Sequence, residues 1–292
     1  SELSVQYVDG LRGPLIVYDP QDPQAHLYDV DDLTTIIQLG DWWQTSSETL
    51  LVGYQATGVV PISDSGTVNG VGRFQGGPEV PFAVTQVVSG KRYRLRIINE
   101  SARNVFTVSI DNHPLTIIEA DGVATVPHTV DMIQMLAGQR YSVVLTADQP
   151  VANYWLNAPF TGGNPALNLH QNATLSRSIL RYQGAPIAEP TTPMTAGPAN
   201  GTSLVEADLR PLVATPAPTP DVNITLELAV VANKAIWNVN NVSYLPPKVP
   251  TLNQILAGAD TMVDFNVTEN TFVLPPHKTV QISFPPTEDD DA

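Results

Sequence analysis

The sequence predicts an all-β protein, built as a β-sandwich or a Greek-key barrel, and three observations support this. The 292 residues include 26 prolines and 19 glycines spread along the chain, which fits many short strands joined by turns. Long stretches with the apolar period of an amphipathic helix are almost absent. Short segments of alternating or β-branched apolar residues follow one another instead, with turn residues between them.

Most of the predicted strands lie in the first two thirds of the chain. Residues 46–73 lack periodicity and are rich in Gly and Ser, so a long loop is expected there. Asp111-Asn112-His113 and Ala137-Gly138 are turn sequences. The predicted strands cover residues 34–39, 85–88, 93–98, 105–110, 115–119, 129–135, 140–146, 153–157 and 178–182.

The last third of the chain has a different composition. Residues 184–221 are rich in Pro, Ala and Thr and predict an extended connector, with a single helical turn at 203–209. Strands resume at 223–230, 235–239 and 279–284. A short helix is predicted at 251–258, where Thr251 is the candidate N-cap and Gly258 the candidate C-cap.

Charge and cysteine content exclude several classes of function. Lys and Arg number 14 against 29 Asp and Glu, a net charge of −15, so we expect no binding to nucleic acid or to an anionic membrane. No apolar run approaches the ~20 residues of a membrane span. The chain has no cysteine, which excludes disulfides, thiolate nucleophiles and cysteine-bound copper.

Asn-x-Ser/Thr sequons predict a secreted, N-glycosylated protein. The polar start Ser1-Glu2-Leu3 has no signal-peptide pattern, so a signal is expected to have been removed or never included. Asn99 directly follows a predicted strand, where burial would block a glycan. The six candidate sites are Asn99, Asn172, Asn200, Asn223, Asn241 and Asn266.

Several motifs, in order along nearly the whole chain, resemble those of fungal laccases, a branch of the multicopper oxidases. The first is residues 6–14, Gln-Tyr-Val-Asp-Gly-Leu-Arg-Gly-Pro, which is similar to the segment that follows a copper-binding His-x-His pair in that family. The others include Asp41-Trp42-Trp43-Gln44, Asn69-Gly70-Val71-Gly72-Arg73, Gly90-Lys91-Arg92-Tyr93-Arg94, residues 106–121, and residues 249–259.

The resemblance implies an internal slice of a protein with three cupredoxin domains. Residues 1–20 would be a remnant of the first domain, residues 21–186 the complete second domain, and residues 187–292 a connector with part of the third. The predicted fold is therefore a cupredoxin-like Greek-key β-sandwich with partial flanking domains. Open sheet edges in a partial domain invite pairing with a partner chain or a second copy.

The sequence departs from the family at one copper-binding position and at a cysteine of the segment that follows it. Glu2 stands where the resemblance places a histidine, and Val8 where it places a cysteine. A laccase needs a thiolate and many imidazoles for its copper centres. No histidine here belongs to a His-x-His pair, and each is expected to be structural or on the surface: His26, His113, His128, His170 and His277. We therefore expect no metal site, no catalytic residue and no bound cofactor.

Two residues match the family's substrate pocket. Asp64 aligns with the acidic residue that anchors phenols in many fungal laccases, and a carboxylate can accept a phenolic proton. The alternative is a loop aspartate that caps a turn. Phe160 resembles a residue of the same pocket. Together they predict a weak cleft for phenolic or aromatic ligands.

Three hypotheses about function remain open. The first is a copper-free, laccase-like secreted glycoprotein without oxidase activity of its own. The second is part of an extracellular, copper-dependent phenol oxidase whose ligands lie on segments absent from this sequence. The third is a hydrolase-type activity on a decayed laccase scaffold, for which no motif is present.

Overall fold

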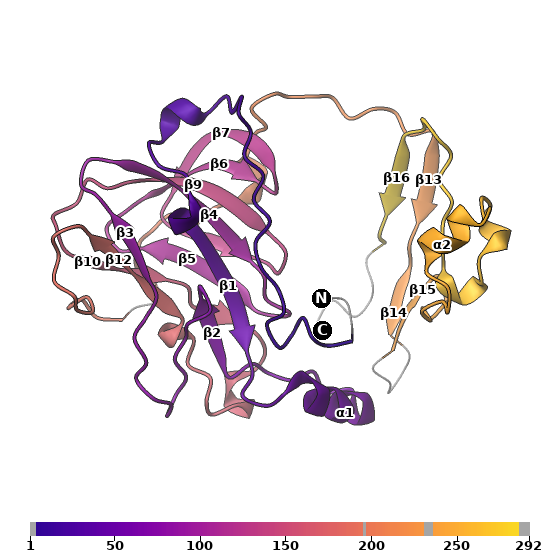
Figure 1. Ribbon diagram of the computed structural model, residues 1–292, viewed down its shortest axis with the longest axis horizontal. Helices are drawn as coiled ribbons and strands as arrows, with labels where there is room; N and C mark the ends of the chain where they lie inside the picture. Colours follow the sequence, from indigo (N-terminus) through magenta and orange to yellow (C-terminus); the bar gives the residue numbers. More distant parts are fainter. Residues whose placement is uncertain (1–3, 195–196, 231–235, 286–292) are drawn as a thin grey trace. The chain divides into compact units, whose positions relative to one another are not determined.

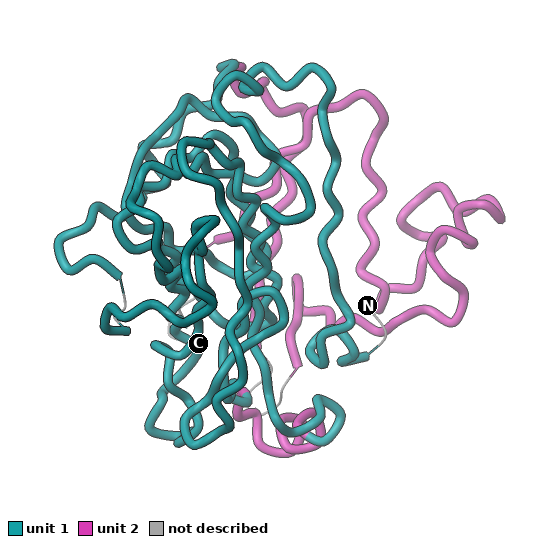
Figure 2. The backbone as a smooth tube through the Cα atoms, turned by 60° about the vertical axis from the view of Figure 1, so that its left-hand side comes forward, with its two compact units in different colours: residues 1–49, 61–214 teal, residues 50–60, 215–292 magenta. Residues whose placement is uncertain are grey.

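The computed structural model describes residues 4–194, 197–230 and 236–285. Glu2, predicted to replace a copper-binding histidine, lies outside the described residues. The chain forms two compact units: residues 1–49 with 61–214, and residues 50–60 with 215–292 (Figure 2). Among the described residues, no helix has the length and apolar character needed to cross a bilayer.

The first unit is a sandwich of two six-stranded sheets, as predicted (Figure 1). One sheet has the order β2-β1-β4-β9-β6-β7. Its strands are β1 (Ile36–Trp42), β2 (Ser65–Val68), β4 (Arg92–Asn99), β6 (Leu115–Ala120), β7 (Val123–Val130) and β9 (Arg140–Thr146). β1 and β4 are parallel, and the other neighbours in this sheet are antiparallel.

The second sheet has the order β11-β5-β10-β12-β3, and β8 also pairs with β5. β12 and β3 run parallel. The chain passes from the first sheet to the second between β4 and β5, and returns to the first between β5 and β6. The two sheets pack face to face around a common core. The strands are β3 (Val84–Val87), β5 (Val105–Ile110), β8 (Ile133–Met135), β10 (Asn153–Asn157), β11 (Phe160–Thr161) and β12 (Arg177–Tyr182).

Residues at every second position along the strands point into the core, as the alternating apolar pattern of the sequence predicts. In β4, Tyr93, Leu95 and Ile97 are buried among the apolar side chains, whereas the guanidinium groups of Arg94 and Arg96 take part in ion pairs. The same period-two pattern buries Tyr141, Val143 and Leu145 in β9, and Phe106, Val108 and Ile110 in β5.

Two elements of the first half differ from the prediction. The loop expected at 46–73 contains the helix α1 (Ser47–Thr57) and the strand β2. The strand expected at 129–135 is the end of β7 followed by the separate strand β8. Asp131, between them, leaves the ladder and accepts hydrogen bonds from the backbone N and the hydroxyl of Thr202.

The connector predicted after residue 184 returns to the first unit as far as residue 214. Isolated bridges join Ser203 to Met132 and Pro211 to Thr125, and Leu204 and Leu209 pack against the core. The predicted helical turn is a short 3-10 helix at Glu206–Asp208. The division into three cupredoxin domains stays a prediction.

The second unit contains two short sheets and one α-helix. β13 (Val222–Thr225) pairs in parallel with β16 (Val280–Ser283), and β14 (Leu228–Val230) pairs with β15 (Trp237–Val239). The predicted helix is α2 (Thr251–Leu256). Its N-cap is Pro250 and its C-cap is Ala257, so the assignment of these roles to Thr251 and Gly258 is wrong. Gly258 is the residue after the C-cap, and its φ of +108° is one that glycine permits.

Short 3-10 helices complete the structure. They lie at Ala25–Leu27, Leu33–Thr35, Pro165–Leu167, Ala173–Leu175, Met262–Asp264 and Val267–Glu269.

Candidate functional site

Asp64 lies directly before β2, and three hydrogen bonds fix its position. Its backbone N donates to the Trp42 carbonyl oxygen at 2.9 Å. Its carboxylate Oδ2 accepts from the Gln44 backbone N at 2.7 Å, and Oδ1 accepts from Asn168 Nδ2 at 3.0 Å. Because an ionised carboxylate offers about four acceptor positions, this half-buried group keeps acceptor capacity for a ligand hydroxyl.

Asn168 is a part of this site that the sequence analysis missed. Its Nδ2 also faces the carbonyl oxygens of Ile62 and Ser63, at 3.1 and 3.3 Å, and its Oδ1 accepts from the His170 backbone N at 3.0 Å. The side chain therefore fixes the loop after β11 to the residues before β2. Asn168 is 104 positions from Asp64, and no local sequence signal connects them.

A cavity of about 200 Å³ lies close to Asp64, which does not itself line it, although its chain neighbour Ser65 does. Two of its lining residues, Trp42 and Gln44, are the backbone partners of Asp64 described above. Its volume is below the roughly 300 Å³ at which drug-sized pockets begin, so it suits a single aromatic ring. The lining residues are Trp42, Gln44, Ser65, Thr67, Gly70, Gly72, Phe74, Pro78 and Val80.

Phe160 does not line this cavity, which corrects the prediction made for it. The side chain is 5% exposed, and its ring centroid lies 5.7 Å from that of Phe106. Both rings pack against Gly66 in β2. Phe160 is therefore a core residue on β11, and the aromatic rings of the cavity come from Trp42 and Phe74 instead.

The histidines do not assemble a copper site in the part of the chain that the structure describes. His113 is buried; its Nδ1 donates to the Asp111 carbonyl oxygen, so Nε2 accepts from the Tyr182 hydroxyl, both at 2.7 Å. His170 meets Phe74 edge-on. Within the described residues no group of three or more His, Cys, Asp or Glu side chains could hold a metal ion.

Val8 lies in a turn, where its backbone N donates to the Val5 carbonyl oxygen at 3.0 Å. With no cysteine in the sequence, the residues that are described do not fit the copper centres implied by the resemblance.

The sequons differ in accessibility. Asn99 is fully buried, and its Nδ2 donates to the carbonyl oxygens of Asn104 and Met135 at 3.1 and 2.9 Å. This is a correction, because the folded chain does not present that amide nitrogen for glycosylation. Asn172 is half-buried, and the exposed candidates are Asn200, Asn223, Asn241 and Asn266.

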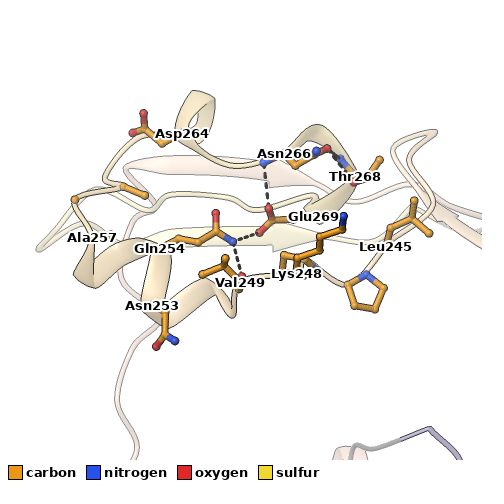
Figure 3. A pocket seen from close by; sticks show the side chains of 14 residues that line it. Leu245, Lys248, Val249, Asn253, Gln254, Ala257, Asp264, Asn266, Thr268 and Glu269 are labelled. Atoms are coloured by element: carbon orange, nitrogen blue, oxygen red, sulfur yellow. Dashed lines mark hydrogen bonds between the residues drawn. The ribbon is translucent and has the colours of Figure 1, made fainter.

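The second unit has a broader cavity of about 800 Å³ (Figure 3). Gln254, on α2, donates from Nε2 to the Val249 carbonyl oxygen and to Glu269 Oε2, both at 2.9 Å. Glu269 Oε1 accepts from the Asn266 backbone N at 3.2 Å. These bonds hold three segments of the unit together, and the described lining residues include no group of three or more His, Cys, Asp or Glu side chains that could hold a metal ion.

A family model and several known proteins match this chain, and all of them are multicopper oxidases or laccases. A family model described as multicopper oxidase matches residues 34–185. Laccase-like protein claX of Ampulloclitocybe clavipes is 62% identical over 300 residues, which cover 95% of this chain and 71% of that protein. Laccase-2 of Agaricus bisporus is 45% identical over 291 residues, which cover 98% of this chain and 55% of that protein.

Solved structures agree on the fold. The multicopper oxidase Fet3p, which functions in iron import, superposes with a TM-score of 0.75 at 23% identity, over 96% of this chain and 52% of that one. The laccase from Botrytis aclada gives a TM-score of 0.64 at 26% identity, over 80% of this chain and 44% of that one.

These likenesses confirm the predicted cupredoxin-like β-sandwich. The chain spans about half the length of the Agaricus bisporus laccase and of these two solved structures. The family model and the high identity to claX and Laccase-2 together show that the chain belongs to the multicopper oxidase family.

Proposed function

We propose that this chain is a secreted, laccase-like glycoprotein that binds phenolic molecules beside Asp64 and does not oxidise them by itself. The observation that carries the proposal is the fixed carboxylate of Asp64 next to a cavity with Trp42 and Phe74 in its lining. A phenol needs both an apolar surface for its ring and an acceptor for its hydroxyl, and in this proposal the cavity supplies the first and the neighbouring Asp64 the second.

The chemistry assigned to Asp64 is that of a hydrogen-bond acceptor. Gln44 and Asn168 donate to separate carboxylate oxygens, so the group is oriented before a ligand arrives. An oriented carboxylate holds the phenolic proton and fixes the oxygen of the ring without paying for side-chain ordering on binding. The Trp42 side chain, 39% exposed, offers an aromatic surface at the cavity.

The proposed lack of oxidase activity rests on the side chains that this chain could offer to copper. One-electron uptake by the family's copper centre requires a cysteine thiolate, and the sequence contains none. Among the histidines on described segments, His113 lies in the core of the first unit, whereas His26 and His277 are exposed.

A second candidate function is favoured by the relatives. Several are named laccases, and this chain spans about half their length at 43–45% identity. In that reading the chain is the substrate-binding part of a copper-dependent phenol oxidase, and a separate segment or partner chain supplies the metal ligands. Asp64 has the same role in both candidates.

Secretion and glycosylation are part of the proposal, supported by the exposed sequons at Asn200, Asn223, Asn241 and Asn266. A partner chain or a second copy is proposed to cover the second unit. This unit has two short two-stranded sheets, and its one buried apolar side chain in the described part is Phe265.

The binding proposal is tested by titrating the purified chain with 2,6-dimethoxyphenol while tryptophan fluorescence is recorded. Trp42 lines the cavity, so saturable quenching is expected. Asp64→Asn keeps the size of the side chain but removes its charge, and should weaken affinity about tenfold, because a hydrogen bond to a charged group is lost. Asp208→Asn, at an exposed carboxylate elsewhere in the first unit, is the matched control.

Quenching that is not saturable, or equal affinity in the chain and in Asp64→Asn, would end the binding proposal. Elemental analysis and oxygen uptake separate the two candidate functions. Stoichiometric copper, together with phenol oxidation that a chelator abolishes, would replace the first candidate by the second.

A further inference from the structure

One loop of the first unit contacts both parts of the proposed phenol site, the carboxylate of Asp64 and the aromatic lining of the cavity. We call residues 162–176, between β11 and β12, the clamp loop. Its two 3-10 helices each follow an asparagine whose Oδ1 accepts a backbone hydrogen bond. Asn164 accepts from the Ala166 N at 3.0 Å, and Asn172 accepts from the Thr174 N at 3.2 Å. These caps give the loop an internal order of its own.

The clamp loop holds the segment that carries Asp64. Asn168 Nδ2 donates to Asp64 Oδ1 at 3.0 Å, and Gln171 Nε2 donates to the Ser63 carbonyl oxygen at 3.1 Å. Asp64 lies just before β2, and the bond from Asn168 restrains the direction of its carboxylate. A binding group keeps its geometry when neighbouring side chains fix it in this way.

The same loop holds the aromatic side of the cavity. Phe74 lies between β2 and β3, and the His170 ring meets it edge-on, with the centroids 5.5 Å apart and the ring planes at 80°. The Gln75 backbone N donates to the His170 carbonyl oxygen at 2.8 Å, and Asn172 Nδ2 donates to Gln75 Oε1 at 3.0 Å. The Phe74 ring is therefore set against a restrained neighbour, in a geometry that aromatic pairs favour.

Asn168 and His170 reach the site through other side chains, since neither of them lines the cavity. Asn168 acts on the carboxylate of Asp64, and His170 acts on the ring of Phe74. Both are therefore positioning residues. Because they contact different parts of the site, their effects on a ligand can be separated by changing the ligand.

We propose that the clamp loop positions the phenol site through two separable contacts. Asn168 sets the recognition of the ligand hydroxyl through Asp64, and His170 sets the recognition of the ligand ring through Phe74. This inference rests on the proposed function and adds the residues that determine which part of the ligand is recognised. A phenol depends on both contacts, whereas the same ring without a hydroxyl depends on His170 alone.

The proposal is tested by fluorescence titration of the full chain with 2,6-dimethoxyphenol and with 1,3-dimethoxybenzene, which is the same ring without the hydroxyl. Asn168→Ala removes the donor that orients Asp64, and should weaken binding of the phenol about tenfold while leaving the affinity for 1,3-dimethoxybenzene unchanged. A purely structural role of Asn168 would weaken both ligands alike. Should Asn168→Ala not fold, Asn168→Ser replaces it, because its side chain is too short to reach Asp64.

His170→Ala removes the edge-on partner of Phe74 and should weaken binding of both ligands about three- to tenfold. His170→Phe supplies another ring at the same position and should restore most of that affinity. The matched controls are exposed side chains elsewhere in the first unit, and Gln21→Ala and His26→Ala should bind both ligands as the unmodified chain does. Thermal unfolding establishes that each variant is folded.

Unchanged phenol affinity in the folded Asn168 variant, or an equal loss for both ligands, would overturn the role of Asn168. Undiminished affinity in His170→Ala, or no recovery in His170→Phe, would overturn the role of His170. Asp64→Asn separates this inference from the proposed function. If Asp64→Asn weakens phenol binding and the clamp-loop variants do not, the clamp-loop proposal alone is wrong. If Asp64→Asn binds the phenol as tightly as the unmodified chain, the proposed function itself fails.

Discussion

Asp41 is fully buried and organises a loop that joins two strands. Its carboxylate accepts from the backbone N atoms of Ala102, Arg103 and Asn104, at 3.0, 2.8 and 3.2 Å. Arg12 Nη1 lies 3.6 Å from Asp41 Oδ1 and supplies the balancing charge. The N-terminal motif therefore serves the scaffold, because its arginine neutralises the anion that holds the loop between β4 and β5.

Replacing Asp41 by alanine should be strongly destabilising. The change removes one partner of a buried ion pair and leaves three backbone donors unsatisfied, so the free energy of unfolding should fall by about 3–5 kcal/mol. Urea unfolding followed by fluorescence measures it. Asp208→Ala, at an exposed site, should change stability by less than about 0.5 kcal/mol. A similar small change for Asp41→Ala would show that the loop is held in another way.

His113 gives the chain a defined dependence of stability on pH. Burial lowers the pKa of His113 below its ordinary value, and the neutral ring accepts from the Tyr182 hydroxyl. An unfolded histidine titrates near ~6.5, so below that pH the unfolded state binds a proton that the native state does not. Stability should therefore fall as pH falls from about 6.5 towards the lowered native pKa of His113.

His113→Gln should reduce the fall in stability at acidic pH, in addition to any loss of stability at all pH values. Urea midpoints between pH about 5 and 7.5 provide the measurement. His26→Gln, at an exposed histidine, should keep the slope. An unchanged slope in His113→Gln would mean that other groups cause the acid sensitivity.

Tyr182 makes the stability of the fold depend on pH at the alkaline end of the range. Burial raises the pKa of Tyr182 to about 12, while an unfolded tyrosine ionises near ~10. Above that pH the unfolded state loses a proton that the native state keeps, so stability should fall as pH rises. The His113–Tyr182 pair is therefore fully intact only where both rings are neutral.

At the residue scale, the sequence predicted the site partly. Asp64 was proposed because the resemblance covers its own short motif, and its role as a ligand acceptor stays a prediction, since its neighbour Ser65 lines the cavity and Asp64 itself does not. Phe160 carried no equivalent evidence, because an aromatic residue near a loop end suits a core as well as a pocket. Asn168 had no signal, since its role arises from a contact between loops distant in sequence.

At the scale of elements, the strands with regular alternation were predicted almost to their ends. β5, β9 and β10 match the predicted ranges, because each is a run of apolar and β-branched residues bounded by turn residues. α1 was missed, since Leu50, Leu51 and Val52 are consecutive and form no helical stripe. Its start depends on Asp9, whose carboxylate accepts from the backbone N and the hydroxyl of Ser47.

β2 was missed for a different reason. It is four residues long and contains Gly66, so it lacks the β-branched run that predicts a strand. A Cβ at Gly66 would lie 2.6 Å from Ser176 Oγ, 2.8 Å from Phe160 and 2.9 Å from Phe106. Tight packing, rather than backbone conformation, requires glycine here.

Gly66→Ala should therefore destabilise the sandwich. Overpacking a close-packed site costs about 1–3 kcal/mol, and the neighbouring rings have little room to move. Gly53→Ala is the matched control, because nothing lies within 4 Å of its added Cβ and it is inside α1. That variant should gain about 0.5–1 kcal/mol of local helix stability. Urea midpoints that shift in the same direction for both variants would contradict this account of β2.

At the scale of the whole molecule, the two units differ in how much apolar surface they bury. The first has a continuous core across both sheets, including Leu95, Phe106, Ile117 and Leu156. In the second, Phe265 is the one buried apolar side chain of the described residues, while Trp237 and Tyr244 are 53% and 60% exposed. Hydrophobic burial supplies most of the stability of a fold, so the two units should not be equally stable.

Hydrogen exchange followed by mass spectrometry should show this difference directly. Amides in β4, β6 and β9 belong to the middle of a six-stranded sheet, and they should exchange only through global unfolding. Amides in β13 and β16 belong to a two-stranded parallel ladder, which is marginal on its own, and they should exchange many-fold faster. Equal protection in the isolated chain at low concentration would show that the second unit is already covered without a partner. Protection of β13 and β16 that rises with chain concentration would instead identify a second copy as the partner, because association stabilises by mass action.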